Sequence, residues 1–243
     1  MASARTTSIA AETCPFDACD GSGFVVDDAT NTASDCRCRA QRVSNARARS
    51  LSGVLPRKYR GVSFDRPPVT EIARPVTAAV KRYVNRIDEQ LDAGRGLWLF
   101  GSVGTGKTTL AMLVSKYALE AGRSVAIYSL PDLLVRIRAT FNDDRSDSYV
   151  DLIDRLTKVD LLHIDDVGAE KTSPWVLEQL YAIVNARYEE ERSIVITTNL
   201  ERDALAEQIT ERTVSRLEEM CEVLPLFGTD QRQELAARRA LGG

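Results

Sequence analysis

The feature that most constrains this chain is a glycine-rich run, GSVGTGKTT, at residues 101–109. An apolar stretch at 97–100 precedes it and apolar residues at 110–119 follow it, so a strand, a loop and a helix are expected in that order. Glycines in such a loop permit tight turns that aim successive backbone N–H groups and a helix N-terminus at one anion. The run therefore predicts a phosphate-binding loop; the alternative is a glycine-rich turn without a ligand.

The loop and one downstream acid form the predicted nucleotide site. Lys107 is expected to reach the β- and γ-phosphates of ATP, and the hydroxyl of Thr108 is expected to hold Mg²⁺. In DLLHIDDVG at 160–168 an apolar strand ends in acids, which places Asp165 at the sheet edge where Mg²⁺ needs a carboxylate. The expected nucleotide-binding residues are Gly101, Ser102, Val103, Gly104, Thr105, Gly106, Lys107, Thr108, Thr109 and Asp165.

Two other residues are interpreted from their place in or after a strand. Asn199 follows the apolar run at 193–197, where a polar tip on a neighbouring strand can orient an attacking water; the alternative is a turn-forming Asn. His163, the only histidine, lies inside the apolar run at 161–164 and is interpreted as a packed core residue.

The order of apolar runs predicts the fold class. Runs at 97–100, 125–128, 161–164 and 193–197 are typical of strands buried on both faces, and helical patterns lie between them. Such alternation indicates an α/β fold with a central parallel sheet flanked by helices. Apolar residues at helical spacing from 74 to 93 begin this main domain, expected at 74–243, and 51–73 is expected to be a linker.

The N-terminal residues 1–50 are expected to form a small separate module with a basic connector. Cys14, Cys19, Cys36 and Cys38 fall within one short stretch, enough thiolates to close a tetrahedral structural zinc site. A segment this poor in bulky apolar residues needs a metal to fold, so Zn²⁺ is preferred over four free thiols. Cys221 stands alone downstream and is expected to be a small core residue.

Charge and hydropathy exclude some classes of protein. A formal net charge of −3 and a pI near 5.4 argue against a protein that coats nucleic acid along its whole surface, although a local basic face is compatible with them. The residues before Cys14 contain no apolar signal-peptide core, and no run approaches the ~20 apolar residues of a membrane helix. A cytoplasmic protein without a membrane partner is therefore expected.

Four motifs occur in order: GSVGTGKTT, LLHIDDVGAEKTSPWVLEQLY, ITTNL and ERTVSRL. In this combination the chain resembles the AAA+ ATPases of the bacterial and phage replicative helicase-loader family (DnaC/DnaI type), with the IstB transposition helpers as close kin. The likeness covers roughly residues 54–232, and the part from Asp165 through Tyr181 is more specific than the phosphate loop. It implies a P-loop AAA+ fold, hydrolysis of ATP to ADP and phosphate, and assembly into a ring or spiral with ATP sites between subunits.

The resemblance also implies catalytic roles. Asp166 stands where related ATPases carry the carboxylate that polarises the attacking water, commonly Glu, so the shorter Asp suggests a slow ATPase stimulated by assembly or DNA. Matching ERTVSRL to the family motif makes Arg216 the arginine that one subunit donates to the next, with Arg212, one turn earlier, as the alternative. Both could instead be solvated helix arginines. Arg232 matches a further family position, with no role assigned beyond possible nucleotide sensing.

Loaders of this family bind single-stranded DNA on the inner face of the ring. The run RIRATF offers Arg136, Arg138 and Phe141 for phosphate contact and base stacking, and Lys171 faces the same side in the family arrangement. The alternative is an ordinary amphipathic helix with Ile137 and Phe141 in the core.

These expectations lead to one function and two competitors. The leading hypothesis is an ATP-dependent loader that delivers a hexameric replicative DNA helicase onto single-stranded DNA during replication initiation. The DnaI-type members carry a zinc-binding N-terminal domain that grips the helicase, which favours this hypothesis over an IstB-like helper of a DNA transposase. A nucleotide-sensing scaffold that barely hydrolyses ATP is the third possibility, since Asp166 replaces Glu.

Overall fold

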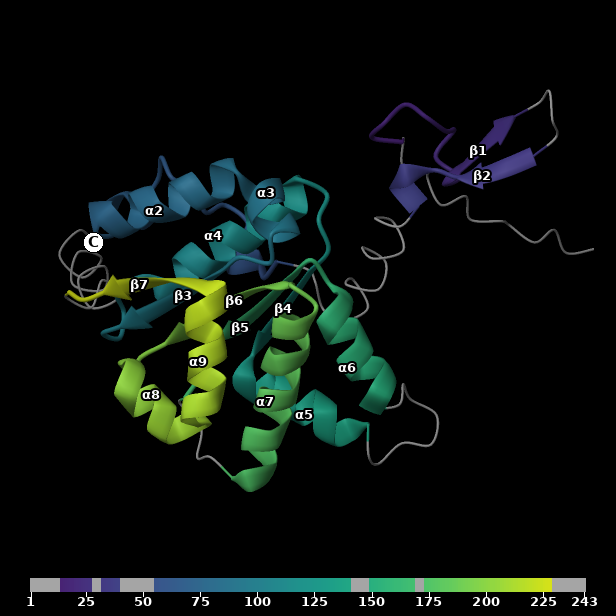
Figure 1. The fold of residues 1–243 in the computed structure, drawn as a ribbon. Helices are drawn as coiled ribbons and strands as arrows, with labels where there is room; N and C mark the ends of the chain where they lie inside the picture. Colours follow the sequence, from purple (N-terminus) through teal and green to yellow (C-terminus); the bar gives the residue numbers. More distant parts are fainter. Residues whose placement is uncertain (1–13, 28–31, 40–54, 141–148, 169–172, 229–243) are drawn as a thin grey trace, which may run out of the picture.

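The computed structural model describes residues 14–27, 32–39, 55–140, 149–168 and 173–228 (Figure 1). Its centre is a parallel five-stranded sheet with the strand order β4-β5-β6-β3-β7. The strands are β3 (Gly96–Gly101), β4 (Val125–Ser129), β5 (Leu161–Asp165), β6 (Ser193–Thr198) and β7 (Cys221–Leu226). Side chains on both faces of the inner strands are buried, because helices cover both sides. The predicted α/β class and its parallel sheet are confirmed.

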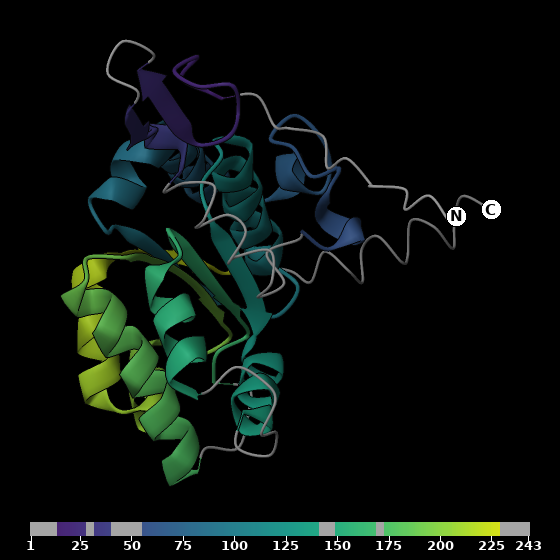
Figure 2. The same ribbon diagram turned by 90° about the vertical axis from the view of Figure 1, so that its right-hand side faces the viewer.

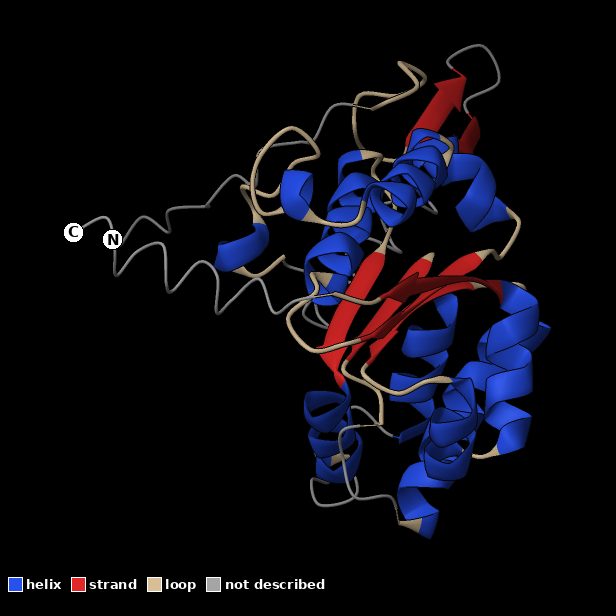
Figure 3. Ribbon diagram, turned by 90° about the vertical axis from the view of Figure 1, so that its left-hand side faces the viewer, coloured by secondary structure: helices blue, strands red, loops and turns tan. Residues whose placement is uncertain are grey.

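Helices pack on both faces of the sheet (Figure 3). One face carries α2 (Arg74–Asn85), α3 (Ile87–Asp92) and α4 (Lys107–Glu120), which bury their apolar side chains against Leu97 and Leu99. The other face carries α5 (Leu130–Ala139), α6 (Tyr149–Lys158), α7 (Pro174–Glu189), α8 (Arg202–Ile209) and α9 (Glu211–Met220). Trp98 lies in this second core, so successive side chains of β3 pack against the helices on opposite faces of the sheet.

The segment from 74 to 93 differs from the single helix that its periodicity predicts. It forms two helices, α2 and α3, which meet at Arg86, where φ is −124° and ψ is 34°. The Arg86 guanidinium bonds to Glu89 in the first turn of α3, and Ile87 and Leu91 remain buried on the core side. The apolar spacing thus predicts the buried face correctly but does not reveal the break.

The segment expected to be a linker contributes to the main core. It holds two short 3₁₀ turns, η1 (Arg57–Tyr59) and η2 (Val69–Glu71). Its apolar side chains are buried with those of α2 and α4, and they are Leu55, Val62, Phe64, Val69 and Ile72. Lys116 of α4 also donates a hydrogen bond to the Val62 carbonyl, so this segment packs on the domain that follows it.

The N-terminal module contains a β-hairpin. Strand β1 (Phe24–Asp27) pairs antiparallel with β2 (Thr32–Asp35). Gly23 leads into β1 with φ near 89°, and its carbonyl accepts a hydrogen bond from the Cys36 N–H just past β2. The hairpin therefore brings the residues before β1 close to those after β2.

Arg187 of α7 is fully buried and holds several elements together. Its guanidinium donates to the carbonyls of Leu156 and Thr157 in the last turn of α6, and of Val159, Asp160 and Ser193 beyond it. A cation at a helix C-terminus satisfies carbonyls that have no partner within the helix. Burial lowers the pKa of Arg187 to about 9, so the side chain stays charged at neutral pH.

We expect Arg187→Met to lower the free energy of unfolding by about 3 kcal/mol, because the buried carbonyls lose their donor. Chemical denaturation monitored by circular dichroism measures the change. Arg192→Met is the matched control, since that side chain is 39% exposed and its ion pair in the described part of the chain is with Asp160. Equal losses in the two variants would contradict the role given to Arg187.

Candidate nucleotide-binding site

The glycine-rich loop connects the end of β3 to the start of α4. Gly101, Gly104 and Gly106 all have positive φ, at 130°, 77° and 97°. A Cβ on Gly101 would lie 2.1 Å from the carbonyl oxygen of Leu226 at the end of β7, and the same oxygen accepts from the Ser102 N–H. Only glycine fits this approach, so the loop begins tightly against β7.

The start of α4 fits a phosphate ligand. Its N-cap is Gly106, which has no side chain to accept from the first N–H groups of the helix. Lys107 is 7% exposed, and its Nζ donates to the carbonyls of Gly101 and Ser102 at 2.9 and 2.6 Å. The ammonium group therefore lies along the loop and does not extend into solvent. The donors expected to contact ATP phosphates thus lie together at one edge of the sheet.

Asp165 lies at the carboxyl end of β5 and is held from two sides. The hydroxyl of Thr108 lies 3.3 Å from its Oδ2, and the hydroxyl of Thr197 donates to its Oδ1 at 2.6 Å. A carboxylate and a hydroxyl side by side are a donor set suited to Mg²⁺, so the predicted pair Thr108 and Asp165 fits that ion. Thr197 was missed from the sequence; its only signal is a hydroxyl at the end of a buried strand.

Asp166 and Asn199 meet although they are far apart in sequence. The Asn199 side-chain amide donates to Asp166 Oδ1 at 3.0 Å, and the Asp166 N–H donates to the Thr197 hydroxyl at 2.9 Å. Asp166 adopts a left-handed backbone with φ near 59°, which turns the chain sharply after β5. Both side chains are exposed, so solvent reaches them. Their geometry suits a base and an orienting amide, and these roles stay predictions.

The two arginines of ERTVSRL lie on α9 and contact α7. Arg212 stacks over the Tyr181 ring, with the guanidinium carbon 4.6 Å from the ring centroid. Arg216 contacts the rings of Tyr181 and Tyr188 and donates from Nε to Asn185 Oδ1 at 2.6 Å. Arg212 is exposed and Arg216 is half-buried, and the catalytic roles of both stay predictions.

The residues predicted to contact DNA are placed only in part. Arg136 and Arg138 are exposed on α5, where Arg136 lies 5.7 Å from the Tyr128 ring and Arg138 lies 4.7 Å from the Trp175 ring. Ile137 between them is fully buried, so α5 is amphipathic. This agrees equally with the alternative hypothesis of an ordinary amphipathic helix that does not bind DNA. Phe141, Lys171 and Arg232 lie outside the described residues.

Two predicted core residues are confirmed as such. His163 is fully buried in β5, and its Nδ1 lies 3.0 Å from the Ser115 hydroxyl. Burial lowers the pKa of His163 to about 4, so the imidazole is neutral at physiological pH. Cys221 is 8% exposed and packs in the core beside α9.

The hairpin module brings Cys14, Cys19, Cys36 and Cys38 together, with all four sulfur atoms within 4.8 Å of one another. Burial opposes ionisation of Cys14, but hydrogen bonds from the backbone N–H groups of Phe16, Ala18 and Cys19 lower its thiol pKa to about 6. Such N–H groups stabilise a thiolate, the form that binds metal. Four converging sulfurs, three of them buried, could hold a zinc ion.

The loop on β3, the acid on β5 and the strand order of the sheet define an AAA+-like ATP-binding protein. The family model of IstB-like ATP binding proteins matches residues 87–237. The chain belongs to this family.

Known proteins similar to this chain include helicase loaders. The replicative helicase loader DnaC of Buchnera aphidicola subsp. Schizaphis graminum is 30% identical over 161 residues, 65% of this chain and 64% of that protein. The DnaC of Escherichia coli strain K12 is 29% identical over 68% of this chain and 66% of that protein. The chain thus spans slightly less than two thirds of each relative. A crystal structure of the DnaC helicase loader matches with a TM-score of 0.62 at 24% identity, over 70% of this chain and 99% of that one.

In the part of the chain that the structure describes, no helix has the length and apolar character needed to cross a membrane.

We expect Lys107→Ala to weaken ATP binding roughly tenfold or more, because the loop loses a charge-assisted donor to phosphate. Titration with a fluorescent ATP analogue measures the affinity, and thermal unfolding checks that the fold is intact. Lys116→Ala, on the same helix but bonded to Val62, is the control and should bind nearly as wild type does. Unchanged affinity in Lys107→Ala would show that the phosphates bind elsewhere.

Proposed function

We propose that this protein is an ATPase that loads a hexameric replicative DNA helicase onto single-stranded DNA. The observation that carries the proposal is one sheet edge where Lys107, Thr108, Asp165, Asp166 and Asn199 converge. This edge occurs in a chain about 30% identical to proteins named replicative helicase loaders.

Within one subunit, different residues bind ATP, hold Mg²⁺ and activate the attacking water. The loop N–H groups and Lys107 hold the phosphates of ATP, and Thr108 and Asp165 hold Mg²⁺, which when bound offsets negative charge on the β- and γ-phosphates. Asp166 accepts the proton of the attacking water, and Asn199 orients that water through its amide. Because Asn199 already bonds to Asp166, base and orienting group form one unit.

Arg216 is the arginine that this subunit donates to the ATP of its neighbour. Its Nε is bonded to Asn185, whereas Arg212, among the residues that the structure describes, has only a ring contact with Tyr181. An anchored guanidinium loses less conformational entropy when it meets the transferring phosphoryl group, so the geometry favours Arg216 over Arg212.

The exposed arginines of α5 provide the contact with single-stranded DNA. Arg136 and Arg138 neutralise backbone phosphates, and the Trp175 ring lies under the Arg138 guanidinium and helps to hold it in place. The four-cysteine module, folded around zinc, binds the helicase.

Two other functions are tested by the same experiment. An IstB-like helper would bind a transposase, and a scaffold would bind a partner without appreciable turnover; the match to the IstB-like family model supports the first of these. Affinity capture from host lysate, followed by mass spectrometry, should recover the replicative helicase. Recovery of a transposase instead would overturn the loader. ATP turnover measured with and without single-stranded DNA then separates the enzyme from the scaffold.

If Arg216 acts across a subunit boundary, Arg216→Ala should keep its ATP affinity and lose roughly 10³-fold in turnover. Lys107→Ala subunits still offer Arg216, and Arg216→Ala subunits still bind ATP. A mixture should therefore regain activity that neither variant shows alone, in a steady-state phosphate-release assay. An Arg216→Ala enzyme as active as wild type, with no recovery on mixing, would pass the role to Arg212.

The purified chain should contain about one zinc ion, measured by inductively coupled plasma mass spectrometry. Replacing Cys36 and Cys38 together by Ser should remove the ion and weaken helicase binding more than ATP binding, because the thiols lie in a different module from the loop. Cys221→Ala is the control and should retain the metal. A metal-free protein whose N-terminal module is stably folded contradicts the zinc proposal.

A further inference from the structure

The face between α7 and α9 places two aromatic rings around one guanidinium. Helices α7, α8 and α9 lie side by side (Figure 2). The Arg216 guanidinium carbon lies 5.4 Å from the Tyr181 ring centroid and 5.1 Å from that of Tyr188, which follows about two helical turns later on α7. Cation–π contacts on two sides restrict where the guanidinium lies.

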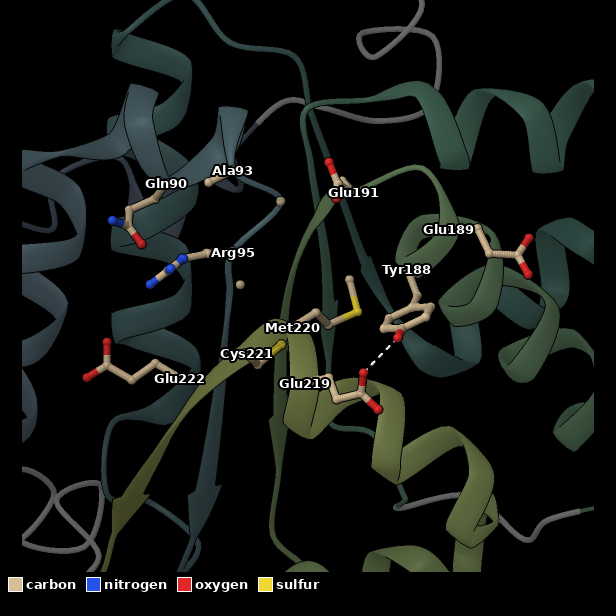
Figure 4. Close-up of a pocket in the computed structure, with 12 residues that line it drawn as sticks. Gln90, Ala93, Arg95, Tyr188, Glu189, Glu191, Glu219, Met220, Cys221 and Glu222 are labelled. Atoms are coloured by element: carbon tan, nitrogen blue, oxygen red, sulfur yellow. Dashed lines mark hydrogen bonds between the residues drawn. The ribbon is translucent and has the colours of Figure 1, made fainter.

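A hydrogen-bond network fixes the groups that hold Arg216. Asn185, between the two tyrosines, accepts from Arg216 Nε at 2.6 Å and from the Tyr181 hydroxyl at 3.1 Å, and its amide donates to Glu189 at 2.9 Å. The Tyr188 hydroxyl donates to Glu219 of α9 at 2.6 Å, beside a cavity of about 820 Å³ (Figure 4). Each side chain that contacts Arg216 is therefore itself held in place.

The end of the Arg216 side chain is left available. Within the described residues, its two terminal nitrogens have no hydrogen-bond or ion-pair partner, since only Nε is bonded. Arg202 at the start of α8 is the contrast, because its guanidinium is bound by Glu211 and Glu218 of α9 and by Asp203. Arg202 is thus a structural ion-pair residue, whereas Arg216 is anchored at one atom and open at the other two.

We infer that Tyr181, Asn185 and Tyr188 are positioning residues that hold Arg216 of one subunit ready for the γ-phosphate of ATP in the next. This inference rests on the proposed trans role of Arg216. We call Tyr181, Asn185 and Tyr188 the α7 cradle. A free arginine side chain loses rotamer entropy when it docks on a phosphate. The α7 cradle restricts Arg216 before the phosphate binds, so less entropy is lost on docking. Because the arginine acts on charge that develops in the transition state, the cradle acts on kcat and leaves KM for ATP nearly unchanged.

The test places the same Asn185 substitution in one of two kinds of subunit, called donor and receiver. Donor subunits carry Lys107→Ala and supply only Arg216; receiver subunits carry Arg216→Ala and supply only the nucleotide site. We expect Asn185→Leu in the donor to lower kcat of the mixture about tenfold, the equivalent of one lost charged hydrogen bond. The same change in the receiver, whose arginine is absent, is expected to cost less than about twofold, since no interaction with Arg216 remains to be lost.

Conservative variants separate positioning from folding. Tyr181→Phe with Tyr188→Phe keeps both rings and with them the cation–π contacts to Arg216, so this donor should retain most of the activity. Donors carrying Leu at both tyrosines should lose about as much as Asn185→Leu.

Each outcome separates the two claims. An inactive parent mixture of donor and receiver overturns the trans arginine itself. An active parent mixture with donor Asn185→Leu at full kcat overturns the cradle and leaves the trans arginine standing. Equal losses in both placements would assign Asn185 to fold stability alone, which also overturns the inference.

Discussion

The interaction on which the rest of the site depends is the pair of bonds that hold Asp165. Its two carboxylate oxygens face different elements: Thr108 at the start of α4 and Thr197 near the end of β6. The Thr197 hydroxyl also accepts from the backbone N–H of Asp166, so one threonine is bonded to both acidic residues. The glycine-rich loop, the carboxylate predicted to bind Mg²⁺ and the candidate base are thereby held in one arrangement across three strands.

The layers of the fold could be predicted because they depend on local pattern. Each inner strand is a short apolar run, since helices cover both faces of a parallel sheet, and the structure places β3, β4, β5 and β6 where those runs lie. The break at Arg86 could not be predicted, because Ile87 and Leu91 keep helical spacing across it. The burial of Val62 and Phe64 depends on contacts with distant helices that composition does not reveal.

The candidate site likewise contains residues that the sequence predicts and residues that it does not. The loop residues could be named because the motif fixes their spacing within nine positions, and Asp165 because it ends a strand. Thr197 was missed because its role exists only when β6 lies beside β5, which joins residues 32 positions apart. Asn185 and the two tyrosines were missed for a related reason. On α7 they read as an ordinary amphipathic helix face, and only the packing of α9 turns them toward Arg216.

Helix α9 and strand β7 together connect Arg216 with the glycine-rich loop. Helix α9 carries Arg216 and runs without a loop into β7, since Met220 ends the helix and Cys221 begins the strand. Strand β7 pairs with β3 along its whole length, and its last carbonyl, that of Leu226, accepts from Ser102 in the phosphate loop. The glycine-rich loop and Arg216 of α9 are therefore connected through β7, which is hydrogen-bonded to β3 along its length. A displacement of α9 relative to α7 would disturb both the α7 cradle and the backing of the loop, because β7 is common to them.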